Sequence, residues 1–213
     1  PFVQGDITDF ATVEQVVLDH GITHILHLAA LQVPFCRANP MLGARVNVTG
    51  TVNVFEVAAK HRAQVQRIVY ASSAAVYGPA GLYPPGPVHE DAPLAPATHY
   101  GVYKQANEGT ARIYAQDNGV TSIGLRPYVI YGLGRDRGVT SSPTKAMLAA
   151  ALGRDFTITY GGRGNFQWGD DAARTVIACA TVPFSGTGVF NLGGSRVPVT
   201  DVIAAIEDAA PVM

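Results

Sequence analysis

Ile68–Ser73 has the sequence IVYASS, a short apolar run that ends in two serines. Similar apolar runs occur at Ile25–Leu28 and Ser122–Leu125, and amphipathic stretches at about residues 41–61 and 100–118 separate the three runs. Strands and helices that alternate at this spacing predict right-handed crossovers, a parallel sheet and helices on both of its faces. The sequence therefore predicts a doubly wound α/β fold, whose ligands bind outside the carboxyl ends of the strands.

The alternation is clearest in the first part of the chain, so residues 1–130 are expected to form the sheet domain. Residues 131–213 are expected to form a smaller mixed lobe, interleaved with strands of the main sheet. Asp9 is the expected N-cap of a short helix that Gly21 ends. A loop rich in proline and glycine spans Pro79–Thr98, and loops of that length are usually functional. Expected elements of the lobe are a helix starting at Ser142 and Pro143, a strand at 156–159, a helix from Asp170 to 178, a strand at 189–191 and a last helix capped by Thr200.

The composition excludes several classes of protein. The chain has 213 residues, of which 47% are hydrophobic and 15% charged, and this is enough apolar material for a buried core. The formal net charge of −1 leaves no basic surplus for phosphates, so nucleic-acid binding is not expected. No run of 18 apolar residues occurs, so no membrane-spanning helix is expected. Cys36 and Cys179 lie far apart, which favours reduced thiols and a cytoplasmic location.

Tyr100 and Lys104 carry the clearest signal for chemistry. They are four residues apart, so they share one face of a helix. A nearby ammonium lowers the pKa of a phenol from its usual value of about 10 toward the working range of a base. With a serine at the end of a neighbouring strand, the pair can take a proton from an alcohol while a hydride leaves for an acceptor such as a nicotinamide. The alternative is an exposed helix with one packed tyrosine and one extended lysine.

Arg67–Gly78 (RIVYASSAAVYG) and Tyr100–Lys104 (YGVYK) resemble the extended short-chain dehydrogenase/reductase family, the NAD-dependent epimerases and dehydratases of sugars and nucleotide sugars. The family's fold is the Rossmann-type doubly wound sheet. Further matches extend over nearly the whole chain: Gly5–Asp9 (GDITD), His27–Ala30 (HLAA), Asn47–Thr51 (NVTGT), Leu125–Pro127 (LRP), Val129–Gly132 (VIYG) and Asp171–Ala173 (DAA).

The resemblance implies a role for each matching residue. Tyr100 is the base, Lys104 is its partner and a ribose ligand, and Ser73 is the hydroxyl donor. Ser73 is preferred to Ser72 because it stands four residues before Tyr77, as the family's catalytic serine or threonine does. The implied cofactor ligands, besides Tyr100 and Lys104, are Asp6, Ile7, Leu28, Ala29, Ala30, Asn47, Ala71 and Pro127. The implied substrate ligands, besides Ser73, are Ala74, Tyr77, Tyr128, Arg135 and Arg163.

Two departures from the family pattern limit these expectations. The glycine-rich phosphate loop of the family, and the residue that separates NAD from NADP, are not found ahead of Phe2. The resemblance therefore predicts a chain that lacks roughly 60 N-terminal residues, binds a dinucleotide weakly and favours NAD. The arginine that often grips a nucleoside diphosphate in the family is matched only by a displaced Arg163, which weakens the expectation of such a substrate.

Several other motifs have a structural explanation beside the functional one. Arg135 and Arg137 can bind an anion or lie in a solvated loop. His24 and His27 point to opposite faces of a strand, so no metal site is expected. Cys36 is expected to be a packed thiol. Asp170 and Asp171 are expected to favour a helix start rather than to act as paired catalytic carboxylates.

Three functions are open from the sequence. The first is an NAD- or NADP-dependent epimerase or dehydratase acting on a sugar-like substrate. The second is a sugar or sugar-acid dehydrogenase with the same residues, which would accumulate reduced cofactor. The third is a silent Rossmann-like scaffold. The resemblance also implies a homodimer formed through the helices at about residues 41–61 and 100–118.

Overall fold

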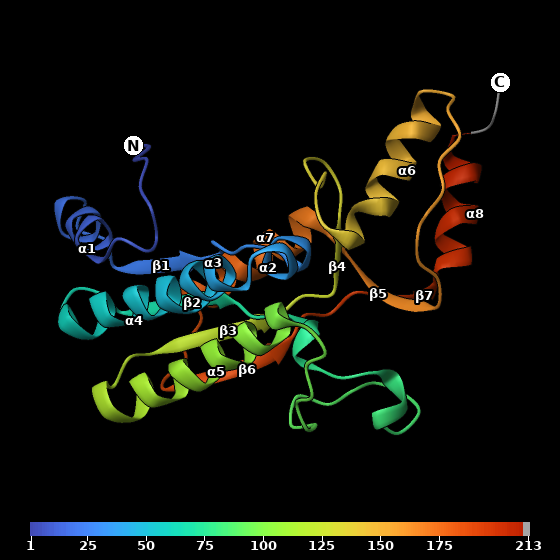
Figure 1. Ribbon diagram of the computed structural model, residues 1–213. Coiled ribbons are helices and arrows are strands. Elements are labelled where there is room, and N and C mark those ends of the chain that lie inside the picture. The colour runs from blue at the N-terminus through green and yellow to red at the C-terminus, as the bar shows by residue number, and fades with distance from the viewer. Residues whose placement is uncertain (211–213) are drawn as a thin grey trace. The chain divides into compact units, whose positions relative to one another are not determined.

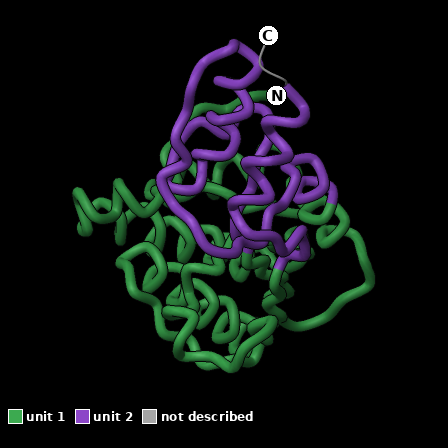
Figure 2. The backbone as a smooth tube through the Cα atoms, turned by 90° about the vertical axis from the view of Figure 1, so that its right-hand side faces the viewer, with its two compact units in different colours: residues 1–126, 175–191 green, residues 127–174, 192–213 purple. Residues whose placement is uncertain are grey.

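The computed structural model describes residues 1–210, and the chain folds into two compact units (Figure 2). Unit 1 comprises Pro1–Arg126 and Thr175–Asn191. Unit 2 comprises Pro127–Arg174 and Leu192–Met213. The two units therefore alternate along the chain: the first segment of unit 2 separates the two segments of unit 1, and the second segment of unit 2 follows the last strand of unit 1.

Unit 1 contains a parallel sheet with the order β1-β2-β3-β6 (Figure 1). Its strands are β1 (His24–His27), β2 (Arg67–Ala71), β3 (Ser122–Arg126) and β6 (Thr187–Asn191). All three strand pairs are parallel, and the sequence predicts this for β1, β2 and β3. The strand expected at 189–191 among the elements of the lobe is β6 of this sheet. The predicted helices and strands of this unit are found within about three residues of their expected bounds, apart from the differences described next.

Helices cover the sheet of unit 1. Asp9 caps the first helix as expected, because its carboxylate accepts hydrogen bonds from the backbone N–H groups of Ala11 and Thr12. The helix expected over 41–61 is interrupted by one π-helical stretch, Arg45–Thr49. Pro34 and Pro40 occupy the first turns of two short helices, where the missing N–H costs no hydrogen bond. The helices are α1 (Phe10–Asp19), α2 (Val33–Ala38), α3 (Pro40–Ala44), α4 (Gly50–Lys60), α5 (His99–Asn118) and α7 (Gly169–Thr181).

The core of unit 1 lies between the sheet and the helices α4 and α5. Phe55 of α4 and Ala111 of α5 are fully buried and belong to one cluster with Ile68 and Tyr70 of β2. The rings of Phe55 and Tyr70 meet edge to face, with centroids 5.7 Å apart. The burial of these apolar side chains, each Å² of which contributes about 25 cal/mol, holds α4 and α5 against the sheet.

Unit 2 differs more from expectation. The prediction of a strand at 156–159 is wrong, because these residues form no strand. The central strand of this unit is β5 (Arg163–Trp168). It pairs in parallel with β4 (Val129–Tyr131) and antiparallel with β7 (Ser195–Pro198). Thr200 lies inside α8 (Val199–Ala209) and is not its cap, since Pro198 precedes the helix. α6 (Ser142–Ala151) starts as expected with Pro143 in its first turn, although Ser141 rather than Ser142 occupies the N-cap position. Within residues 1–210, no helix is both long and apolar enough to cross a membrane.

The start of α5 lies unusually close to the segment that follows β2. That segment forms two short 3-10 helices, Ala74–Val76 and Ala80–Leu82. A Cβ atom at Gly101 would overlap the carbonyl oxygen of Ala75 and lie 2.8 Å from Cβ of Pro96. Only glycine permits this approach, which brings the residues after β2 next to the first turn of α5.

Two glycines of α5 provide a matched test of this contact. Gly101→Ala is expected to destabilise unit 1 by about 1–3 kcal/mol, because a buried close contact must open. Gly109→Ala is expected to stabilise it by about 0.5–1 kcal/mol, because a Cβ there meets nothing within 4 Å. Urea denaturation followed by circular dichroism measures both. Equal effects of the two substitutions would contradict the close contact.

Candidate active site

Ser72 and Ser73, at the carboxyl end of β2, have different surroundings. Ser72 is buried, and its Oγ donates to Oε1 of Glu108 at 2.5 Å. Ser73 is half-buried, and its Oγ accepts from the backbone N–H of Ala75 at 3.1 Å. Its own O–H therefore remains available as a donor. These contacts support the choice of Ser73 as the hydroxyl donor.

Tyr100 and Lys104 lie on one face of α5, as their spacing predicts. The Lys104 Nζ is 5.6 Å from the centroid of the Tyr100 ring. Nζ donates to the carbonyl oxygen of Ala71 at 2.6 Å, and the side chain is 3% exposed. Burial lowers the pKa of Lys104 to about 8. The contact at Ala71 places this ammonium at the end of β2, where Ser73 follows two residues later.

The residues expected to hold a cofactor occupy two further segments of unit 1. Asp6 is exposed and its carboxylate accepts from the N–H of Thr8, which lowers the pKa of Asp6. Asn53 donates to the carbonyl of Ile7 at 3.0 Å and holds the same turn. Leu28–Ala30 follow β1, and Leu28 is 56% exposed.

Asn47 fixes the chain immediately after this segment. Its amide accepts from the Leu31 N–H at 2.7 Å and donates to the Leu31 carbonyl at 2.8 Å. Asn107 of α5 in turn donates to the backbone carbonyl of Asn47 at 2.9 Å. Asn47 is itself in the π-helical stretch, so the irregular helix, the loop after β1 and α5 are joined by these bonds.

His27 and Cys36 are buried beside this group. His27 Nε2 is 2.9 Å from Oγ1 of Thr51, and burial, followed by the charge of Lys104, lowers the pKa of His27 to about 4. Cys36 donates to the carbonyl of Leu31, and burial raises its pKa. Both side chains are therefore neutral near pH 7. In residues 1–210 no group of three His, Cys, Asp or Glu side chains is arranged to hold a metal ion.

Glu108, which no sequence motif marks as a functional residue, extends the Tyr100–Lys104 face of α5 by one more helical turn. Its two carboxylate oxygens accept from Nε and Nη2 of Arg126, both at 2.8 Å. The side chains of this ion pair are 8% and 5% exposed. The only sequence signal was the repeated four-residue spacing, since Arg126 is distant in the chain.

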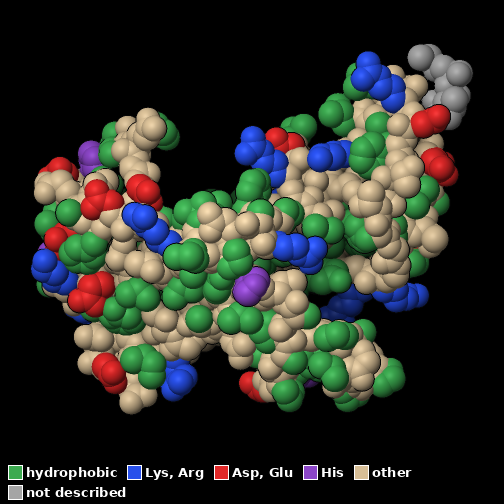
Figure 3. Space-filling model, in the orientation of Figure 1, with side chains coloured by type: hydrophobic (Ala, Val, Ile, Leu, Met, Phe, Trp, Pro, Cys, Tyr) green, Lys and Arg blue, Asp and Glu red, His purple; other side chains and the backbone are tan. Residues whose placement is uncertain are grey.

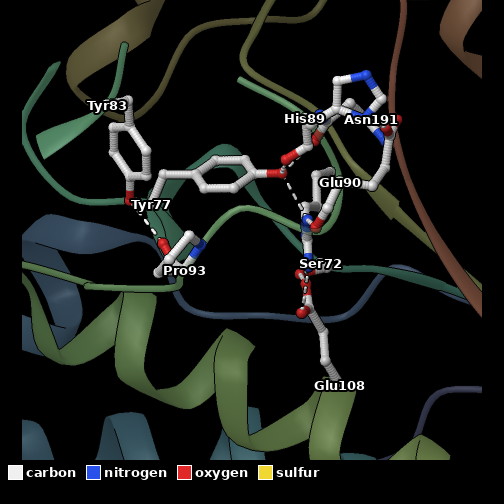
Figure 4. Close-up of polar contacts among 9 residues, drawn as sticks. Ser72, Tyr77, Tyr83, His89, Glu90, Pro93, Glu108 and Asn191 are labelled. Carbon is white, nitrogen blue, oxygen red and sulfur yellow. Dashed lines mark hydrogen bonds and ion pairs between the residues drawn. The ribbon is translucent and has the colours of Figure 1, made fainter.

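Tyr77 was expected to contact substrate, but its hydroxyl is engaged within unit 1 (Figure 4). It accepts from Nη1 of Arg126 at 2.5 Å and donates to Oδ1 of Asn191 at 2.8 Å. Asn191, at the end of β6, also donates its side-chain amide to the carbonyl of Val88 and its N–H to Glu90. Tyr77 and Asn191 thus anchor the long loop at the carboxyl ends of the strands.

The remaining expected residues lie in unit 2. Tyr128 is 50% exposed, and Nη2 of Arg135 donates to Thr140 Oγ1 at 3.1 Å. Arg163 is exposed at the start of β5. Asp170 and Asp171 lie in the first turn of α7, where acidic side chains favour the helix dipole. Tyr128, Arg135, Arg163 and Pro127 remain predicted ligands.

The model of the NAD dependent epimerase/dehydratase family matches residues 1–193. The chain belongs to this family. UDP-glucuronate 4-epimerase 3 of Arabidopsis thaliana is 31% identical to it over 223 residues, which cover 96% of this chain and 51% of the relative. The chain therefore spans about half the length of that relative, and of UDP-glucuronate 4-epimerase 2 from the same plant.

Solved structures show the same fold. A partial consensus L-threonine 3-dehydrogenase is 28% identical, with a TM-score of 0.90, and the match covers 99% of this chain and 69% of that one. UDP-glucose 4-epimerase of Thermus thermophilus, solved with NAD, is 26% identical, with a TM-score of 0.85 and coverage of 100% and 70%. These matches confirm the doubly wound fold that the sequence predicts.

The burial of the Lys104 ammonium predicts how the free energy of unfolding changes with pH. The pKa of Lys104 is about 8 in the folded chain and about 10.4 in an unfolded one. Between these values the unfolded state binds more protons, so the free energy of unfolding rises with pH. Relative to Lys104→Met, the unaltered chain should gain up to about 3 kcal/mol across this window. Urea denaturation at several pH values measures the difference, and a flat or falling difference would contradict the burial.

Proposed function

We propose that this domain oxidises a sugar-like alcohol transiently, by hydride transfer to NAD, in an epimerase or dehydratase reaction. The observation that carries the proposal is the buried Lys104 ammonium beside the Tyr100 ring at the carboxyl end of β2. Near that end, Ser73 keeps a free hydroxyl donor. This is the arrangement that acid–base chemistry on an alcohol requires.

The donor groups of unit 1 fit NAD. Lys104 has three N–H donors, and the Ala71 carbonyl takes one, so two can reach ribose hydroxyls. Asp6 and Ile7 would contact the adenine, and Leu28–Ala30 would lie along the cofactor with Asn47 holding their loop. NAD, when bound, supplies the hydride acceptor. NAD is proposed over NADP because the matching family is described as NAD dependent.

Each member of the set has a separate task. Tyr100 takes the alcohol proton, and the ammonium of Lys104 favours the phenolate that this requires. Ser73 donates a hydrogen bond to the substrate oxygen as charge develops on it. Ala74, Tyr77, Tyr128, Arg135 and Arg163 are proposed as substrate ligands from their match to the family.

We favour a nucleotide sugar as the substrate class, because the curated relatives that match nearly the whole chain are UDP-glucuronate 4-epimerases. A dehydrogenase is the second candidate, since structures named L-threonine dehydrogenase align with TM-scores of 0.90 and 0.88. A silent domain is the third. The inactive mitochondrial L-threonine 3-dehydrogenase of Homo sapiens is 35% identical over 104 residues. The unpaired thiols fit the cytoplasmic location that the sequence predicts.

Turnover assays separate the three candidates. The chain, alone and fused behind the N-terminal region of UDP-glucuronate 4-epimerase 3, is incubated with NAD and UDP-glucuronate, UDP-glucose or L-threonine. An epimerase forms the epimer, seen by NMR, without lasting absorbance at 340 nm, whereas a dehydrogenase accumulates reduced cofactor. No turnover in either form would favour the silent domain.

In an active form, Tyr100→Phe should lower the single-turnover rate about 10²–10⁴-fold while leaving NAD affinity unchanged, because only the proton-transferring oxygen is removed. Tyr103→Phe on the same helix is the matched control. Its hydroxyl donates to the carbonyl of Pro40, away from the proposed chemistry, so the rate should stay near that of the unaltered chain. A near-normal rate for Tyr100→Phe would eliminate Tyr100 as the base.

We also propose a homodimer formed through α3, α4 and α5. Figure 3 shows hydrophobic side chains over α3 and α4 on one face. Met41 of α3 is 85% exposed, and Leu42 of α3 and Val102 and Ile113 of α5 are between 42% and 48% exposed. Single exposed apolar side chains are common, but several on neighbouring helices favour an interface.

Light scattering at micromolar concentration should give the mass of a dimer. Met41→Glu should shift it toward the monomer, because a carboxylate would be buried without a partner. Leu82→Glu, in the long loop and 63% exposed, is the control and should leave the dimer intact. A monomeric mass for the unaltered chain would refute this interface.

A further inference from the structure

Tyr100, Lys104 and Glu108 follow one another at four-residue intervals along one face of α5. Side chains at this spacing are neighbours, and a lysine and a glutamate there ordinarily attract each other. Lys104 and Glu108 are 3% and 9% exposed, so little water screens their charges. An ion pair between them is therefore the arrangement that α5 alone would favour.

The structure shows a different pairing. Glu108 accepts from Arg126 on both oxygens, at 2.8 Å each, and from Ser72 at 2.5 Å (Figure 4 shows the Ser72 contact). The Lys104 ammonium turns to the carbonyl of Ala71 instead. Among the described residues, Lys104 forms no ion pair. The carboxylate of Glu108, which is one turn from Lys104 on α5, is thus already neutralised by Arg126 of β3.

We propose that Arg126 is a positioning residue that occupies Glu108 and thereby keeps the Lys104 ammonium available to Tyr100 and to the cofactor ribose. This rests on the proposed function for the roles of Tyr100 and Lys104. The charges of Arg126 and Glu108 cancel, so the buried face keeps the positive charge of Lys104. If Arg126 were absent, Lys104, one turn away, would be the buried cation left for Glu108 within residues 1–210.

Arg126 is held in place by groups other than Glu108. Its Nη1 donates to the Tyr77 hydroxyl at 2.5 Å and to the carbonyl of Glu90 at 2.9 Å. Its guanidinium also lies over the Tyr77 ring, 5.0 Å from the centroid. The Nη1 atom of the guanidinium is therefore held by residues of the long loop, while Nε and Nη2 bind the carboxylate of Glu108.

The other groups that face Lys104 do not compete for its charge. The thiol of Cys36 has a raised pKa because it is buried, and His27 has a pKa of about 4 for the same reason, so both are neutral near pH 7. Tyr100 presents the face of its ring to Nζ. Glu108 is the buried carboxylate next along this face of α5, so its release from Arg126 should change the titration of Lys104.

The test measures the pKa of Lys104 directly, without substrate. The chain contains three lysines, Lys60, Lys104 and Lys145, so carbon-13 labelling of the lysine Cε atoms gives a simple NMR spectrum, assigned with Lys104→Arg. Arg126→Met should raise the Lys104 pKa by about one pH unit or more, because the released carboxylate favours the ammonium. Arg126→Lys, which keeps a cation for Glu108, should leave it near the value of the unaltered chain.

Neutralising Glu108 provides the decisive controls. Glu108→Gln alone should lower the Lys104 pKa, because it leaves the guanidinium of Arg126 uncompensated on the same buried face. The double variant Arg126→Met with Glu108→Gln should return the pKa to that of the unaltered chain, and an apolar replacement of a buried pair is often tolerated. Circular dichroism checks that each variant is folded.

Three results would overturn the proposal: an unchanged Lys104 pKa in folded Arg126→Met, no return in the double variant, or a rise in Glu108→Gln. The last of these remains decisive even where Arg126→Met does not fold. These readouts need no turnover. Absence of activity with the expected NMR result would therefore count against the proposed function and not against the role of Arg126.

Discussion

The carboxylate of Glu108 joins three elements of unit 1. It receives Ser72 from the end of β2 and Arg126 from the end of β3, while Glu108 itself belongs to α5. Removing one partner of such a buried pair costs about 3–5 kcal/mol, because the remaining charge is left uncompensated. The same contacts fix the position of α5 along its axis relative to the carboxyl ends of β2 and β3. The positions of Lys104 and Tyr100, one and two turns earlier on that helix, depend on them.

The sequence was sufficient for the parts of the fold with local signals. Three apolar runs predicted three neighbouring parallel strands, and the pairing of β1, β2 and β3 confirms this. The spacing of Tyr100 and Lys104 predicted a shared helix face, which the contact of Nζ with the ring confirms. Asp9 capped its helix as expected. In each case the information lay within a few neighbouring residues, where helix and strand periodicity determine which side chains meet.

Features that depend on distant partners were not predictable in the same way. Ser72 and Ser73 are neighbours at the end of β2, and their different surroundings depend on Glu108, 36 residues away, which accepts from Ser72 alone of the two. β5 contains arginine, glycine, asparagine and glutamine, so it lacks a strand pattern, and it forms because β4 and β7 pair with it on both sides. The apolar run at 156–159 has a better pattern but no ladder partner. Pairing overrode local preference there, as strand propensity depends strongly on context.

The place of β6 has a consequence for how the chain folds. β3 ends at Arg126, and its neighbour β6 begins only at Thr187, after the first segment of unit 2, Pro127–Arg174. The larger unit therefore cannot complete its sheet until that segment has been synthesised. Closing so long a loop costs little more entropy than closing a shorter one, since the cost grows only with the logarithm of length. The separation of β3 and β6 in the chain does, however, make their pairing slow and late, because non-local pairing retards folding. Until then the free edge of β3 is exposed, and a ribosome-bound intermediate would present it to chaperones or to other nascent chains.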